Sequence, residues 1–136
     1  MKKVIAVDLD GTMAQYNGRE HIDYNPSKVG QPIPRMIARI KAWLNAGMDV
    51  VIFTARVHPS NGKDEVAVCE KAIKKFCKDT IGQELEITCE KRPTFVEIWD
   101  DRAVRVIKDS GVISDGTDVF DPLSACDTDS IGQFLG

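Results

Sequence analysis

The sequence predicts an α/β protein with a mainly parallel β-sheet. Short apolar segments rich in Val and Ile alternate along the chain with longer segments whose apolar residues recur every three to four positions. The short segments are typical of strands buried on both faces, and the longer ones of amphipathic helices. Strands that alternate with helices join through right-handed crossovers into a parallel sheet. The expected strands are 4–7, 48–53, 85–88 and 95–99, and the expected long helices are 33–46 and 64–80.

The composition indicates one globular domain over residues 1–136, because 43% of the residues are hydrophobic and 29% are charged. The net charge of −3 excludes a broad basic surface for nucleic acid, although a local basic groove stays compatible with it. No apolar run approaches the roughly 20 residues of a membrane span. The four cysteines form no CxxC pair and no signal peptide is visible, so we expect reduced thiols and a cytoplasmic protein.

The first half of the chain opens with the strand at 4–7, which runs directly into Asp8 and Asp10. Several Gly and Pro residues interrupt 10–32, so we expect a loop or small hairpin over the end of this strand. Loops at that edge of a parallel sheet tend to contact substrate. The helix at 33–46 follows, with its apolar side chains on one face.

The second half supplies two further strands. The helix at 64–80 carries acidic residues in its first turn, which suits the positive end of the helix dipole. A short strand at 85–88 and a longer one at 95–99 come next, and the longer strand ends at Asp100 and Asp101.

The chain after Asp101 predicts a short third helix, a last short strand and a tail. Apolar residues at helical spacing mark the helix, namely Ala103, Val106 and Ile107. Gly111 would stop it, and 112–113 would form the strand. The core of the domain would then cover about 3–113. Residues 114–136 form an acidic tail with one short packed patch (Val119, Phe120 and Leu123), and the spacing of its aspartates does not match an EF-hand.

Polar side chains follow several of the predicted strands directly. Asp8, Thr54 and the pair Asp100–Asp101 each come just after an apolar strand. All strands of a parallel sheet point their carboxyl ends to the same edge, where open α/β sheets place their chemistry. We therefore expect these side chains to meet at one site. Clustered aspartates are costly without a cation, and oxygen ligands of this kind suit Mg²⁺.

The stretch from Val4 to Thr12, with the pattern hhhDxDGT, resembles the first motif of the haloacid dehalogenase-like (HAD) superfamily, whose members are mostly phosphatases. Thr54 matches the second motif, and Lys91 is the best candidate for the third, with Lys63 as the fallback. Asp100 and Asp101, followed by Arg102, resemble the DDR variant of the fourth motif in small members without a cap domain. The resemblance implies a Rossmann-like three-layer sandwich without a cap, because no insertion is long enough to form one.

The resemblance also implies roles for these residues. Asp8 would be the nucleophile that forms an aspartyl-phosphate, and Asp10 the general acid and base. Mg²⁺ would be held by Asp8, by the backbone carbonyl of Asp10, and by Asp100 or Asp101. The carboxylate at position 10 favours a phosphatase or a phosphotransferase over the metal-independent dehalogenases, which lack it.

Thr54 and Lys91 would contact the phosphoryl oxygens of the substrate. Loop side chains would set specificity in an open site, above all Arg19, Arg56 and His58. The expected activity is hydrolysis of a phosphomonoester carried by a small molecule, a nucleotide or a nucleic-acid terminus. Two alternatives stay open, a phosphate- or nucleotide-binding module with negligible turnover and a phosphotransferase. The physiological substrate and the oligomeric state stay open too.

Overall fold

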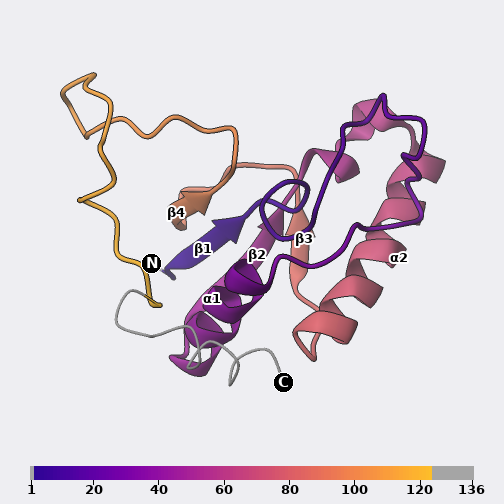
Figure 1. The fold of residues 1–136 in the computed structure, drawn as a ribbon, viewed down its shortest axis with the longest axis horizontal. Coiled ribbons are helices and arrows are strands. Elements are labelled where there is room, and N and C mark those ends of the chain that lie inside the picture. Colours follow the sequence, from indigo (N-terminus) through magenta and orange to yellow (C-terminus); the bar gives the residue numbers. More distant parts are fainter. Residues whose placement is uncertain (1, 124–136) are drawn as a thin grey trace.

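The computed structural model of the chain describes residues 2–123. Four strands form one parallel sheet in the order β3-β2-β1-β4 (Figure 1). Their bounds are Val4–Val7 for β1, Asp49–Phe53 for β2, Glu86–Thr88 for β3 and Phe95–Trp99 for β4. This arrangement confirms the predicted α/β fold and its parallel sheet. Predictions about residues of the acidic tail beyond Leu123, with Cys126 among them, lie outside the described residues.

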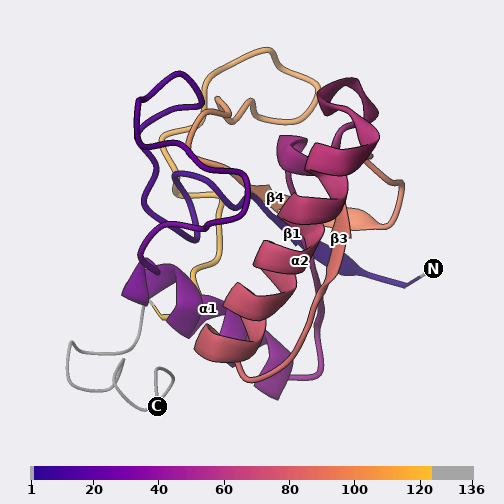
Figure 2. The same ribbon diagram turned by 90° about the vertical axis from the view of Figure 1, so that its right-hand side faces the viewer.

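Two helices pack on one face of the sheet, α1 (Pro34–Asn45) and α2 (Lys63–Thr80), and Figure 2 shows α2 in front of the strands. Their buried side chains share one apolar cluster with Ile5 and Val7 of β1 and Ile52 of β2. The members from the helices are Met36, Ile37, Ile40, Trp43, Ile73, Phe76 and Cys77. Burial of this cluster drives the docking of the helices, because each of its aliphatic and aromatic side chains contributes about 1.5–3 kcal/mol of hydrophobic stabilisation. Neither helix is long and apolar enough to cross a membrane.

The opposite face of the sheet is covered differently. A smaller cluster of Val4, Ala6 and Val51 lies there. Phe53 and Phe95 pack against this cluster, and the centroids of their two rings are 5.6 Å apart. The connection at 89–94 leads from β3 back to β4 without a helix. In the described chain, both long helices therefore pack on one face of the sheet, and the smaller apolar cluster lies on the other.

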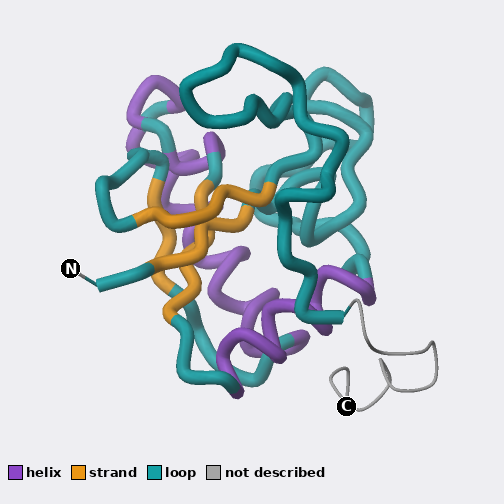
Figure 3. The backbone as a smooth tube through the Cα atoms, turned by 90° about the vertical axis from the view of Figure 1, so that its left-hand side faces the viewer, coloured by secondary structure: helices purple, strands orange, loops and turns teal. Residues whose placement is uncertain are grey.

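The short third helix predicted after Asp101 is absent from the described residues, and the prediction was wrong. Residues 101–120 form loops and turns (Figure 3), with one antiparallel bridge between Val106 and Ile113. Backbone hydrogen bonds from Ile107 N to Val112 O and from Ser114 N to Arg105 O extend this bridge. The β-branched residues there favour extended backbone, and their side chains stay largely exposed, so burial of an apolar face does not stabilise a helix here.

The chain returns from this loop to α1. Arg39 of α1 makes a bidentate ion pair with Asp121 at 2.8 Å and lies over the ring of Trp99. Leu123 is buried against Ala38, as predicted for the packed patch, whereas Phe120 is 73% exposed. Three of the four cysteines fall in the described part of the chain (Cys69, Cys77 and Cys89), and all three are free thiols.

Candidate active site

Three carboxylates meet at the carboxyl edge of the sheet, as the strand order requires. Asp8 follows β1, and Asp100 and Asp101 follow the neighbouring strand β4. One oxygen of each lies within 4.8 Å of the others. The backbone N–H of Asp8 donates to Trp99 O at 2.9 Å, so the two strand ends are held in register.

The residues Gly11 and Thr12 of the first motif hold Asp101 in this cluster. The hydroxyl of Thr12 donates to Asp101 Oδ1 at 3.2 Å and accepts from Asp101 N at 3.0 Å. Gly11 has a φ of +86°, and a Cβ at this position would lie 2.5 Å from Asp101 Oδ2. Glycine is therefore needed here both for the backbone conformation and for the space beside the carboxylate.

The cluster is electrostatically strained without a cation. Burial, followed by repulsion from Asp100, raises the pKa of Asp8 from 3.8 to about 7. A divalent cation among these oxygens would reverse this shift, because an opposite charge nearby favours the ionised carboxylate. Carboxylate oxygens from two strand ends are hard donors of the kind that bind Mg²⁺, so the residues fit the ion that the sequence resemblance implies.

Asp10 lies outside the carboxylate cluster. Its two oxygens accept hydrogen bonds from Arg56 Nε at 2.7 Å and Nη2 at 2.9 Å. Arg56 is only 6% exposed, and its Nη1 donates to Lys28 O at 2.9 Å. The structure thus places Arg56, which the sequence suggested as a substrate contact, against Asp10 and the loop at 11–32. Arg56 orients the side chain of Asp10 and keeps it away from Asp8.

The turn after β2 forms another side of the candidate active site. Thr54 is buried, and its hydroxyl accepts from Arg56 N at 3.2 Å. His58 is exposed, and its Nδ1 accepts from Ser60 N at 3.0 Å. Asn61 donates to Ala55 O at 2.9 Å and so closes the turn. Sequence reasoning did not single out Asn61, because an asparagine in a turn is common and carries no chemical signature of its own.

These residues surround one cavity of about 380 Å³. Its lining includes Asp8, Asp10, Thr54, His58, Asp100 and Asp101, together with the cations Arg19, Arg56 and Arg102. The structure therefore brings together most of the residues that the sequence predicted. Arg19 is also committed to an ion pair with Glu65 of α2 at 2.8 Å.

Neither candidate lysine lines this cavity. Lys91 lies on the turn before β4 and lines a separate groove beside that strand. Lys63 is exposed at the first residue of α2. The positive charge around the carboxylates comes instead from arginines, among which Arg102 had no clear role on the sequence alone.

Comparison with known proteins supports this picture. The profile of the family described as "Polynucleotide kinase PNKP phosphatase domain" matches residues 2–109. A solved structure of a conserved protein from Bacteroides thetaiotaomicron has a TM-score of 0.50 and 21% identity, over 80% of this chain and 84% of that one. This likeness supports the fold alone. No curated protein matches the sequence. On the extent of the profile match, the chain belongs to the PNKP phosphatase-domain family of the HAD superfamily.

Proposed function

We propose that the protein is a Mg²⁺-dependent phosphatase that hydrolyses a phosphomonoester through an aspartyl-phosphate on Asp8. The separation of the two first-motif carboxylates carries this proposal. Asp8 belongs to the cluster with Asp100 and Asp101, whereas Asp10 is held apart by Arg56. One carboxylate is thus available as a nucleophile and the other for proton transfer.

Asp8, Asp100 and Asp101 would hold Mg²⁺. The bound ion would offset the negative charge of these carboxylates and of the substrate phosphate. An oxygen of Asp8 attacks phosphorus, a P–O bond forms, and the bond to the ester oxygen breaks. Asp10 gives its proton to the leaving oxygen, and in the second step it takes a proton from the water that cleaves the acyl phosphate.

The bidentate contact with Arg56 fixes the Asp10 carboxyl group at the wall of the cavity. From this position it can exchange protons with the leaving oxygen and with the attacking water. Thr54 donates its hydroxyl to a phosphoryl oxygen, and Arg102 supplies positive charge at the open side of the cavity.

The substrate is a phosphorylated small molecule, a nucleotide or a nucleic-acid end. Membership in a phosphatase-domain family implies a phosphorylated substrate, and the description of that family favours the nucleic-acid end. Either a phosphate-binding module or a phosphotransferase would use the same cavity. The complete pair of first-motif carboxylates argues against a binding module, and the open site argues against transfer, because phosphotransferases of this superfamily usually need a cap to exclude water. Product analysis with added acceptor alcohols distinguishes hydrolysis from transfer.

The test is release of inorganic phosphate from glycerol phosphate and from nucleoside monophosphates, with Mg²⁺ and with a chelator. We expect activity with Mg²⁺ only, and its loss in Asp8→Asn. Asp79→Asn is the matched control, because Asp79 pairs with Lys75 on the exposed side of α2. Activity that persists in chelator or in the Asp8 variant would contradict the mechanism.

A further inference from the structure

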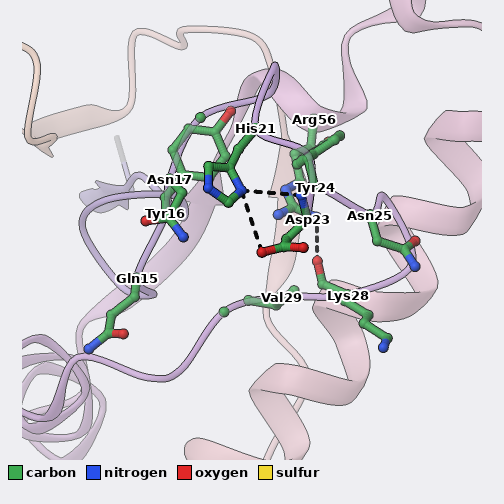
Figure 4. A pocket seen from close by; sticks show the side chains of 12 residues that line it. Gln15, Tyr16, Asn17, His21, Asp23, Tyr24, Asn25, Lys28, Val29 and Arg56 are labelled. Carbon is green, nitrogen blue, oxygen red and sulfur yellow. Dashed lines mark hydrogen bonds and ion pairs between the residues drawn. The ribbon is translucent and has the colours of Figure 1, made fainter.

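The loop at 11–32 encloses a second cavity, of about 240 Å³, beside the candidate active site (Figure 4). Its lining includes Tyr16, His21, Asp23, Tyr24, Lys28 and Arg56. Tyr16, Tyr24 and Arg56 line the active-site cavity as well, so these side chains form the wall between the two spaces.

The loop that forms this cavity is anchored at several points. The backbone N–H of Gln15 donates to Gln31 O at 2.8 Å, which joins the two ends of the loop. Gly30 lies so close to Gln15 that a Cβ would approach its carbonyl oxygen to 2.1 Å. The Nη1 atom of buried Arg56 donates a hydrogen bond to the backbone carbonyl of Lys28 in the loop. Because each contact restrains the backbone, the cavity is a property of the fold.

The position of Asp10 shows on which side of the phosphate the rest of the substrate must lie. Asp10 has to reach the leaving oxygen, so the organic part of the substrate begins beside it. Tyr16 lines the active-site cavity together with Asp10, and it also lines the loop cavity. Burial raises the pKa of Tyr16, and the negative charge of Asp10 adds to that rise, so the phenol lies within electrostatic range of Asp10. The leaving group therefore extends toward Tyr16 and the loop cavity.

Tyr16 is the ring that is open to a ligand. It is 42% exposed, its ring contacts Tyr24 edge to face at a centroid distance of 6.4 Å, and its hydroxyl group interacts with the backbone of Arg19. Tyr24 is already packed against Arg19 and Arg56, whose guanidinium carbons lie 5.6 Å and 5.3 Å from its ring centroid. A planar aromatic group suits an exposed ring flanked by cations, because stacking and cation–π contacts act on the same face.

We propose that the loop cavity is a subsite for the nucleobase of the leaving group and that Tyr16 is its stacking platform. This inference rests on the proposed phosphatase function and narrows its substrate class to base-bearing phosphates, that is, nucleotides or nucleic-acid ends. His21 and Lys28 provide polar groups at the rim of the subsite, where they can contact the edge of the base. A sugar phosphate would fill the active-site cavity without using this subsite.

The test compares kcat/KM for a nucleoside monophosphate with kcat/KM for glycerol phosphate. We expect Tyr16→Ala to lower the ratio of the two about tenfold, as for the loss of one base–aromatic stack. Tyr16→Phe keeps the ring and should keep the ratio. Phe120→Ala is the matched control, because Phe120 is an exposed aromatic side chain in a groove that shares no residue with the loop cavity. A ratio that Tyr16→Ala leaves unchanged, with both rates lowered equally, would show a structural role only and overturn the proposal.

A binding measurement separates failure of this inference from failure of the proposed function. A nucleotide that carries a fluorescent adenine analogue is titrated into the full chain and its Asp8→Asn variant. Stacking on Tyr16 predicts quenching that Tyr16→Ala removes and Tyr16→Phe retains, whether or not phosphate is released. Equal quenching in Tyr16→Ala would refute the subsite, and absence of phosphate release from every substrate would refute the phosphatase alone.

Discussion

The raised pKa of Asp8 makes the stability of the metal-free protein depend on pH. Asp8 titrates near 3.8 in an unfolded chain and at about 7 in the folded one. The folded state therefore binds the proton more tightly than the unfolded state does. The contribution of this group to stability is full below about pH 4 and is lost as the pH rises to about 7.

The size of the effect follows from the shift. A rise of about 3 pH units corresponds to about 4 kcal/mol at roughly 1.4 kcal/mol per unit. Asp8 borders an open cavity, so solvent screens its interactions with the other carboxylates, and we expect about 2 kcal/mol in practice. Mg²⁺ should restore this stability, because an ion that binds only the folded state stabilises it.

The assay is urea unfolding followed by tryptophan fluorescence in chelator, at about pH 5 and about pH 8. Asp8→Asn keeps the shape of the side chain and removes its charge. We expect the variant to be about 2 kcal/mol more stable than the wild type at the higher pH, and much closer to it at the lower pH. Added Mg²⁺ should stabilise the wild type more than the variant. The same pH dependence in both proteins would refute the account of the carboxylate cluster.

Four further substitutions test how the site is held and which cations it uses. Gly11→Ala forces a Cβ against Asp101, so we expect about a 100-fold loss of Mg²⁺-dependent phosphate release, with the fold retained by circular dichroism. Arg56→Lys removes the bidentate contact with the general acid, and kcat should fall about tenfold, while circular dichroism again reports an intact fold. Arg102→Ala should lower kcat/KM for glycerol phosphate about tenfold or more, whereas Lys91→Ala should change it little. A larger loss from Lys91→Ala would show that the turn before β4 moves toward the carboxylates during turnover.

Several features of the fold and site followed from local sequence. The apolar run before Asp8 predicted a strand buried on both faces. The helical spacing of apolar residues predicted the helices before and after β2. Since parallel strands point the same way, the meeting of Asp8 with Asp100 and Asp101 was predictable without any contact information. The close approach of Gly11 to Asp101 was not predicted, because it joins the first and the fourth motif across two strand ends.

Other features depended on how the chain packs. No local pattern indicates that Arg56 binds Asp10, because that contact requires the loop at 11–32 to fold back over the sheet. The residues after Asp101 have helical spacing, yet a helix forms only where its apolar face is buried, and here they form a turn and a single bridge. The sequence by itself determined the strands, their common direction and the carboxylates at their ends, since these depend on residues close together in the chain. Only the tertiary structure decided which cations reach those carboxylates and where the leaving group can lie, since these depend on contacts between distant segments.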